Sequence, residues 1–287
     1  MPYPAGGPVD LLGRAIAPRL GEVLGQPVVV ENRAGGSGTI GMDATIKAEP
    51  DGYTFGFGVP GGIAVLPHLQ KLPYNVDEIN YVSVVAKVPQ VITVGPSVPV
   101  NSLPELIALA KRDPGKLNYG STGSGSSNHL SMELFMSMTG TKMTHIPYKG
   151  SAPAVAALIG GDTDVLFDNI PNIIAQIKAG SVTPIAVTGS KPAAMLPGIP
   201  TVAESGVPGY EVNVWFGIQM PAGTPKPIVE KANRQLAEIF RTEEVTKRFN
   251  DQGVEVVAST PEEFQKLIAS EAAKWAKVVK DAGVKIE

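Results

Sequence analysis

The chain has 287 residues, 43% hydrophobic and 18% charged, which is the composition of a globular protein with about two domains. Its net charge of −3 arises from interleaved acids and bases, so no basic stripe indicates a nucleic-acid surface. The absence of cysteine excludes thiol catalysis, disulfide bonds and cysteine-ligated zinc, and no apolar run reaches the ~20 residues that span a bilayer.

In the first third of the chain, short apolar runs alternate with amphipathic stretches, a pattern that predicts α/β units with parallel strands. Apolar residues at helical spacing predict a helix over 9–25, with Gly25 as its C-cap. Three consecutive valines at 28–30 predict a buried strand. The further predicted elements are a helix over 37–48, a strand over 53–59, a short helix near 62–69, and strands near 80–86 and 90–95.

A proline-rich joint over 95–99 precedes a second set of elements. Ser102 and Glu105 form a capping-box pattern at the start of a predicted helix over 102–112. Strands and helices then alternate, which again indicates α/β units. The predicted strands are 117–121, 143–148, 164–168 and 182–188, and the helices between them are 126–138, 151–159 and 170–179.

The last third begins with a stretch over 189–211 that is rich in proline and glycine and is predicted to be irregular. A final helix is predicted after Thr260, which has the character of an N-cap with Pro261 at the first helical position. The elements predicted between these two are a long strand over 212–220, helices over 226–241 and 243–252, and a short strand at 254–257.

These elements predict two lobes. A parallel sheet is covered by helices on both faces, and the N-terminal set has too few helices to do this alone. We therefore assign the C-terminal helices to the first lobe, which gives a discontinuous lobe 1 of 1–94 plus 218–287 and a lobe 2 of 95–217. Two-lobed folds with paired crossings commonly close around a ligand, so we expect hinges near residues 95 and 217.

Three loops combine glycine or polar residues with a predicted helix start. The first is Pro4-Ala5-Gly6-Gly7-Pro8-Val9-Asp10, in which glycine lets backbone N–H groups approach an anion at a helix N-terminus. It lacks the Lys-Ser/Thr of a P-loop and the spacing of a dinucleotide fingerprint, so nucleotide binding is poorly supported. A tight turn followed by an acid in the first helical turn explains this loop equally well.

The second loop is Gly120-Ser121-Thr122-Gly123-Ser124-Gly125-Ser126-Ser127-Asn128-His129, between a predicted strand and a predicted helix. Its hydroxyls and backbone donors at a helix N-terminus suit a carboxylate or another anion. Capping by Ser126 or Ser127 is the simpler interpretation, but capping needs only one or two such residues. The serines do not fit the Gly-x-Ser-x-Gly pattern of a hydrolase.

The third loop contains Asp168 and Asn169, at the end of an apolar strand and the start of a helix. Either residue could be an N-cap or could bond a polar group of a ligand, and both interpretations stay open. The histidines His68, His129 and His145 lack metal-ligand spacing, and no Ser-His-Asp triad follows from the sequence. We therefore expect no metal, no cofactor and no catalytic residue.

Six motifs occur in one order over essentially the whole chain. They are Pro4-Ala5-Gly6-Gly7-Pro8-Val9-Asp10, Val29-Val30-Glu31-Asn32-Arg33, Pro50-Asp51-Gly52-Tyr53, His145-Ile146-Pro147-Tyr148-Lys149-Gly150, Pro200-Thr201-Val202-Ala203-Glu204-Ser205-Gly206 and Trp275-Ala276-Lys277-Val278. This set resembles the Bug-type extracytoplasmic solute receptors of tripartite tricarboxylate transporters. The resemblance implies the two-lobed α/β fold of periplasmic binding proteins (Venus flytrap), each lobe a mostly parallel sheet flanked by helices, with the ligand cleft between them.

The resemblance also implies a function: a monomeric periplasmic receptor, not an enzyme, that captures a small organic carboxylate and delivers it to membrane transporter subunits. In the family the carboxylate is held by the first loop and the serine-rich loop. The positions carried over are Tyr3, Ala5, Gly6, Gly7, Asp10, Ser121, Thr122, Ser124, Ser126, Ser127, Asp168 and Asn169. The far end of the pocket varies between members, so the sequence does not name the acid.

Two alternatives stay open. A ligand sensor would signal to a membrane partner, and an enzyme on the same fold would need a titratable base at the cleft, for which His129 is the only candidate. Family members also carry a signal peptide and a first strand ahead of the first loop. Because this sequence opens at Met1-Pro2-Tyr3 without either, we expect the natural precursor to continue upstream with both.

Overall fold

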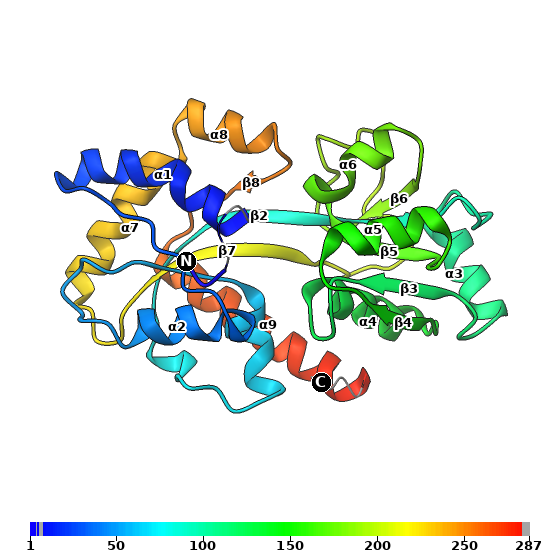
Figure 1. Cartoon of the computed structure of the whole chain (residues 1–287), viewed down its shortest axis with the longest axis horizontal. Coiled ribbons are helices and arrows are strands. Elements are labelled where there is room, and N and C mark those ends of the chain that lie inside the picture. Colours follow the sequence, from blue (N-terminus) through cyan, green and yellow to red (C-terminus); the bar gives the residue numbers. More distant parts are fainter. Residues whose placement is uncertain (4, 6–7, 283–287) are drawn as a thin grey trace. The chain divides into compact units, whose positions relative to one another are not determined.

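The computed structural model of the chain describes residues 1–3, 5 and 8–282, which form two compact units (Figure 1). Unit 1 consists of residues 1–87, 215–250 and 255–275, and unit 2 of residues 88–214, 251–254 and those from 276 onward. Two strands run through both units, β2 (Asn80–Val94) and β7 (Asn213–Met220). The lobe boundaries at 94/95 and 217/218 stay a prediction.

Unit 1 contains short antiparallel pairings. β1 (Gly56–Gly58) pairs with β7, and β8 (Glu255–Val256) pairs with β2. Its helical elements are α1 (Pro8–Leu24), η1 (Gly36–Gly38), α2 (Thr39–Ile46), η2 (Gly61–Val65), η3 (Leu66–His68), η4 (Val76–Glu78), α7 (Lys226–Phe240), α8 (Glu243–Asn250) and the first part of α9 (Pro261–Ala282). One core cluster joins Met42 and Ile63 to Trp215 and Phe264, so segments far apart in the sequence share it.

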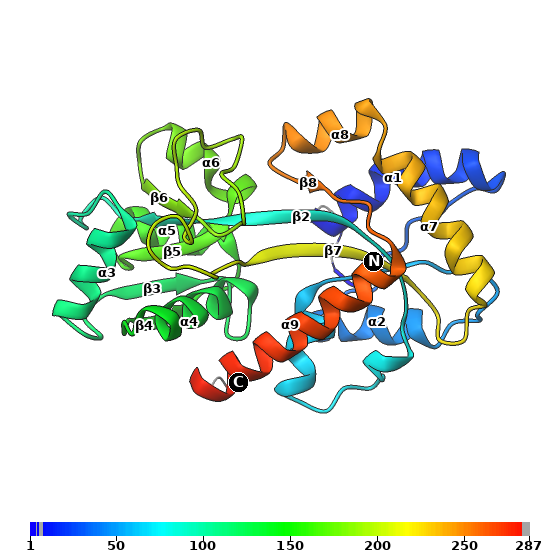
Figure 2. The same ribbon diagram turned by 180° about the vertical axis from the view of Figure 1, so that it is seen from behind.

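Helix α1 illustrates how the sequence pattern becomes a buried face. Val9, Leu12, Ile16 and Leu20 recur every three or four residues, and all four are buried. The helix lies beside α7 in both views of the molecule (Figure 1 and Figure 2). It ends just before Gly25, whose φ of 67° is the left-handed conformation of a helix C-terminal glycine, as predicted.

Unit 2 is built around the parallel strands β3 (Asn118–Ser121), β4 (Thr144–Pro147) and β5 (Val165–Asn169), in the order β4-β3-β5. The long strand β2 continues the sheet antiparallel to β5 and to β6 (Thr183–Val187). Its helices are α3 (Leu103–Arg112), α4 (Ser127–Thr139), α5 (Ser151–Gly160) and α6 (Ile170–Lys178). Helices α5 and α6 bury one apolar face against β2 and β5, and α4 packs on β3 and β5 (Figure 1).

The strand predicted at 28–30 is wrong. Val29 is 85% exposed, Val28 and Val30 are half-buried, and the segment pairs with no strand among the described residues. Backbone pairing begins only beyond it: the amino group of Met1 donates to the Glu31 carbonyl at 2.7 Å, and the Arg33 N–H donates to the Met1 carbonyl at 2.8 Å. Three valines predict a strand by their side chains, but a strand also requires a hydrogen-bonded neighbour.

The two strands predicted at 80–86 and 90–95 are one continuous strand, β2. Pro89 lies between the two predicted strands, and proline cannot donate to a ladder. In the structure Pro89 falls where the partner changes. The pairing with β8 ends at Lys87 and the pairing with β5 starts at Gln90, so Pro89 lies between these two ladders.

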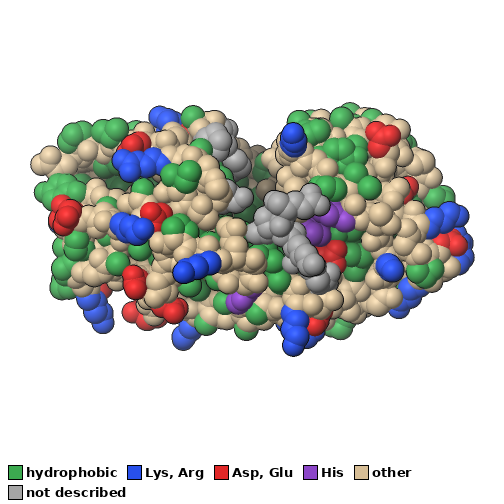
Figure 3. Space-filling model, turned by 60° about the horizontal axis from the view of Figure 1, so that its bottom comes forward, with side chains coloured by type: hydrophobic (Ala, Val, Ile, Leu, Met, Phe, Trp, Pro, Cys, Tyr) green, Lys and Arg blue, Asp and Glu red, His purple; other side chains and the backbone are tan. Residues whose placement is uncertain are grey.

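The predicted helix caps are confirmed. Ser102 is the N-cap of α3, and its side chain accepts the Glu105 N–H. At the start of α9, Thr260 and Glu263 bond each other's backbone N–H groups at 2.8 and 3.1 Å, which is a complete capping box. Over the described part of the chain, no helix combines the length and apolar character needed to cross a membrane. Basic and acidic side chains are interspersed over the face drawn in Figure 3.

Candidate functional site

The predicted site residues of unit 2 lie where three parallel strands end. The carboxyl ends of β3, β4 and β5 share one edge of the sheet, which is the edge where ligands bind in open α/β folds. Residues 121–127 begin at the last residue of β3, and the pair at 168–169 ends β5. We call residues 121–127 the serine loop. It leads into α4, whose first N–H groups have no partner within the helix.

Most hydroxyls of the serine loop hold the loop itself. The Oγ of Ser126, the N-cap of α4, accepts the N–H of His129 at 3.3 Å. Thr122 Oγ1 donates to Asn128 Oδ1 at 2.8 Å, and Ser127 Oγ approaches the same atom at 3.5 Å. Ser124 is half-buried, and its hydroxyl has no hydrogen-bond partner among the described residues. Of the loop hydroxyls, that of Ser124 is therefore the one with no partner among the described residues, and ligand contact by the loop serines and Thr122 stays a prediction.

Asp168 is fully buried, and its carboxylate is surrounded by donors. It accepts hydrogen bonds from the Ser151 hydroxyl, the Asn169 N–H at 2.7 Å, the Asn172 amide at 3.0 Å and the Asn128 amide at 3.2 Å. Burial raises the pKa of the Asp168 carboxyl, and these hydrogen bonds act in the opposite direction. The donors come from the first turns of α4, α5 and α6, so Asp168 joins three helix N-termini.

Asn169 differs from its neighbour. It is the N-cap residue of α6, but its side chain makes no capping bond, and its Oδ1 is buried without a partner among the described residues. Gln90 lies opposite Asn169 in the β2–β5 ladder, and both polar atoms of its buried side chain also lack partners. Of the two residues predicted in this loop, Asn169 is the one with an unengaged acceptor. Ligand contact by either residue stays a prediction.

A stacked pair of histidines lies next to the serine loop. The rings of His129 on α4 and His145 on β4 are 3.9 Å apart between centroids and 5° from parallel, and Tyr119 stacks on His145 at 4.9 Å. Burial lowers the pKa of His145 to about 4, and the neighbouring His129 contributes in the same direction. The His145 ring is therefore neutral at pH 7.

Polar groups surround this pair. His145 Nε2 lies 2.6 Å from the Ser121 hydroxyl, which is itself fully buried. His129 Nε2 lies 3.5 Å from Glu133 Oε1, an atom that also accepts the Tyr119 hydroxyl. Desolvation opposes ionisation of Glu133, but the bonds from His129 and Tyr119 outweigh it and lower the pKa of this carboxyl. We call Tyr119, Ser121, His129, Glu133 and His145 the histidine cluster.

The sequence does not predict this cluster, because its histidines have neither metal-ligand spacing nor a triad pattern along the chain. His129 and His145 lie on different elements and meet through the parallel register of β3 and β4, in which Tyr119 pairs with His145. A three-dimensional pairing of β3 with β4 was the missing information.

In unit 1, the structure describes Tyr3, Ala5 and Asp10, whereas Gly6 and Gly7 lie outside the described residues. Ala5 is exposed in a turn. Tyr3 is packed against Gly38: a Cβ on Gly38 would lie 3.0 Å from the Tyr3 hydroxyl oxygen, and the φ of Gly38 is 96°, so this position suits only glycine. Burial raises the pKa of Tyr3 to about 12, so its hydroxyl is an uncharged hydrogen-bonding group.

Asp10 is buried in the first turn of α1 and is already bonded. Its carboxylate accepts both the Arg14 Nε–H, at 2.9 Å, and the Asn32 amide, also at 2.9 Å. Asn32 donates in addition to the Tyr3 carbonyl at 3.1 Å, and its own oxygen accepts from Arg14. This network ties Tyr3 to α1. A direct ligand contact of Asp10 stays a prediction.

Two glycine-rich turns of unit 1 were not among the predicted site residues. One is η1 (Gly36–Gly38), which lies against the second, the π-helical turn η2 (Gly61–Val65). A Cβ on Gly61 would meet no atom within 4 Å, and π turns are frequent at functional sites. The density of glycine at 35–38 and 61–62 was the sequence signal that could have identified these turns.

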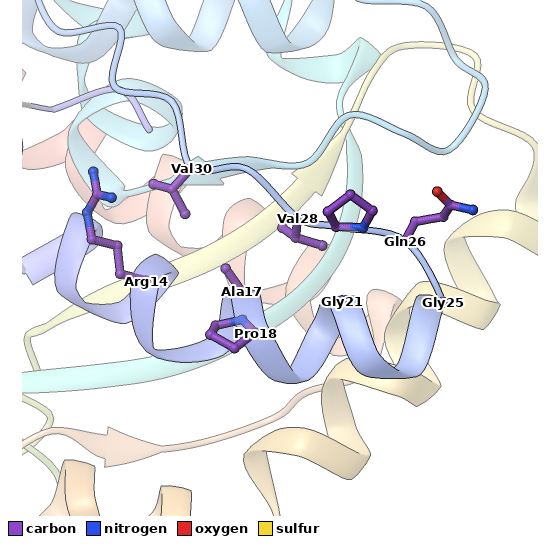
Figure 4. Close-up of a pocket in the computed structure, with 9 residues that line it drawn as sticks. Arg14, Ala17, Pro18, Gly21, Gly25, Gln26, Val28 and Val30 are labelled. Atoms are coloured by element: carbon purple, nitrogen blue, oxygen red, sulfur yellow. The ribbon is translucent and has the colours of Figure 1, made fainter.

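An open cavity of about 690 Å³ lies between α1 and the segment 26–30 (Figure 4). The only long polar side chains in its lining are Arg14 and Gln26, and the Arg14 Nε is bonded to Asp10. None of the predicted ligand-binding residues lines it. We do not assign the ligand to this cavity, since small-molecule sites place several polar groups around the ligand.

Comparison with known proteins identifies the chain. The model of the tripartite tricarboxylate transporter family receptor matches residues 12–284. The chain belongs to this receptor family. It is 37% identical to protein BugT of Bordetella pertussis, over 100% of this chain and 89% of BugT. This family membership and the Bug-type resemblance were both predicted from the sequence and are confirmed.

Solved structures of similar proteins confirm the fold of this tripartite tricarboxylate receptor. An R. palustris protein solved with adipate is 39% identical, covers 100% of this chain and 96% of its own, and superposes with a TM-score of 0.84. MatC from Rhodopseudomonas palustris with bound malate is 30% identical, with coverage of 97% and 96% and a TM-score of 0.80. The α/β fold of periplasmic binding proteins, predicted above, is therefore correct.

Proposed function

We propose that this receptor captures a small organic dicarboxylate in the periplasm and delivers it to the membrane subunits of a tripartite tricarboxylate transporter. The proposal rests on the family and on two similar proteins, one solved with adipate and one with malate. Both ligands are dicarboxylates, so this class is the first to test.

The serine loop is the observation that carries this proposal. It offers an unengaged hydroxyl, that of Ser124, next to the first N–H groups of α4, and anions bind at helix N-termini because the dipole and the free N–H groups favour them. The neighbouring Asp168 carboxylate is screened by its own four donors. A carboxylate of the ligand would bind through neutral donors of this loop.

Thermal unfolding with a panel of acids tests this function. A ligand that binds only the folded state raises Tm by mass action, so adipate and malate should raise it with increasing concentration. The matched controls are the dimethyl esters, which retain the carbon chain but carry no carboxylate. Equal shifts from adipate and its diester would contradict carboxylate recognition. Release of the protein by osmotic shock tests the periplasmic location, and receptor-dependent uptake of labelled adipate tests delivery.

The geometry gives the enzyme alternative little support. A hydroxyl and an imidazole do meet, at Ser121 and His145, but Ser121 is fully buried and also exchanges hydrogen bonds with Gly123. His129, the base considered from the sequence, is buried, with Nδ1 bonded to the backbone and Nε2 facing Glu133. Both imidazoles are thus engaged in holding structure, and the family is one of receptors.

A further inference from the structure

Two glycines of the serine loop are held by side chains of the histidine cluster. The Gly125 N–H donates to His129 Nδ1 at 3.0 Å. The Gly123 N–H donates to Ser121 Oγ at 3.2 Å, and the same oxygen lies 2.6 Å from His145 Nε2. Gly123 and Gly125 both have positive φ, at 136° and 74°, so the backbone here needs glycine and gains no support from side chains of its own.

The bond to Gly125 determines the tautomer of the His129 ring. A backbone N–H can only donate, so Nδ1 of His129 must be the unprotonated acceptor nitrogen. In a neutral ring the proton is then on Nε2, the nitrogen that lies 3.5 Å from Glu133 Oε1. Stacking on His145 and the bond between Glu133 and Tyr119 limit the rotation of this ring. The acceptor nitrogen is therefore aimed at the loop by groups on two strands and a helix.

We propose that His129, supported by His145, is a positioning residue of the ligand site: its Nδ1 holds Gly125, and thereby sets Ser124 and the start of α4 in the arrangement that receives the carboxylate. This inference rests on the proposed function. It assigns His129 a role through the loop, without contact to the ligand. Among the described residues, a bond from the Ser126 N–H to the Gly123 carbonyl closes the turn around Ser124 and Gly125, and the imidazole holds the Gly125 N–H within that turn.

The bond itself can be measured without any ligand. In uniformly ¹⁵N-labelled protein, a hydrogen bond between two nitrogens produces a scalar coupling across it. We expect this coupling between the Gly125 amide nitrogen and His129 Nδ1, together with the ¹⁵N shifts of a ring protonated at Nε2. Absence of the coupling in folded protein at pH 7, or a ring protonated at Nδ1, would overturn the proposal.

Two substitutions separate positioning from general stability. In His129→Asn the side-chain oxygen can reach the position of Nδ1, whereas in His129→Gln it reaches toward Nε2, so only the Asn variant keeps an acceptor for Gly125. With adipate as the probe, calorimetry should give a Kd within about threefold of the unmodified protein for Asn and about tenfold weaker for Gln, the loss expected for one hydrogen bond. His68→Asn, at an exposed histidine, is the control.

Failure of this inference and failure of the proposed function give different experimental results. If neither adipate nor malate binds the unmodified protein, the function is wrong, and the coupling still decides whether His129 holds Gly125. If the coupling is present but the folded Gln variant binds adipate as well as the Asn variant does, the bond is only structural and the positioning role is refuted. A folded Asn variant that loses binding would refute it too.

Discussion

At the scale of single residues, the buried acid of unit 2 has a structural role. Asp168 accepts four hydrogen bonds from residues at the starts of three helices, and it is fully buried. Hydrogen bonds to a charged group are stronger than neutral ones. A buried donor that loses its acceptor destabilises the folded state by its full desolvation free energy. The residue thus holds the edge of the sheet on which the serine loop lies.

Replacing Asp168 by asparagine should therefore act mainly on stability. The amide has one acceptor oxygen and turns an NH₂ group toward donors, so we expect Asp168→Asn to lower the free energy of unfolding by about 1–3 kcal/mol. Urea denaturation measures this change. Asp162→Asn, at an exposed aspartate of the same unit, is the matched control and should be close to neutral. A stability equal to that of the control would mean that Asp168 does not join the helices.

His145 should make stability depend on pH. Its pKa is about 4 in the folded protein, because of burial and of His129, against about 6.5 for an unperturbed imidazole. Between these values the unfolded chain binds more protons than the folded chain, so the free energy of unfolding falls as the pH is lowered from about 6.5 toward 4. Tm measured from pH 8 to pH 5 should fall less steeply in His145→Gln than in His68→Asn. Parallel curves would show that the pKa of His145 is not lowered in the folded protein.

At the scale of elements, two serines near the start of α4 are expected to have different roles, one in capping and one in ligand binding. Ser126 caps the helix, whereas Ser124 has no partner among the described residues. Ser126→Ala should lower stability by about 1 kcal/mol, the usual value of an N-cap. Ser124→Ala should leave Tm unchanged and weaken adipate binding by about tenfold or less. The two variants thus serve as each other's control, and a reversed pattern would exchange the two roles.

The sequence predicted local structure well where the information is local. Periodicity and caps identified nearly every helix, including those that begin after the N-caps Ser102 and Thr260. The prediction failed at 28–30, because a valine run does not reveal whether a neighbouring strand exists. It also failed at Pro89, because neither flanking segment indicates that the strand continues past the proline with a different partner. The histidine cluster depends on the register between β3 and β4, which is also not local.

At the scale of the whole molecule, the strands that connect the two units are relevant to function. Two continuous strands, β2 and β7, run through both units, and Pro89 of β2 lies between its pairings with β8 and β5. We expect ligand binding to close the lobes about these strands. Small-angle scattering should give a smaller radius of gyration with saturating adipate than without it, and dimethyl adipate should have no effect. An unchanged radius at saturation would argue against a hinge mechanism.

The order in which the core residues are synthesised has a consequence for how the protein folds. One cluster of unit 1 joins Met42 and Ile63 to Trp215 and Phe264, whereas the cluster of unit 2 lies wholly between Val91 and Leu196. Domains tend to fold as they are completed during synthesis. Most of unit 2 can therefore collapse while the first 87 residues still wait for their partners. The N-terminal part, which carries the glycine-rich turns, can complete its core only after Phe264 has been synthesised, and until then it is the part that a chaperone or protease would meet.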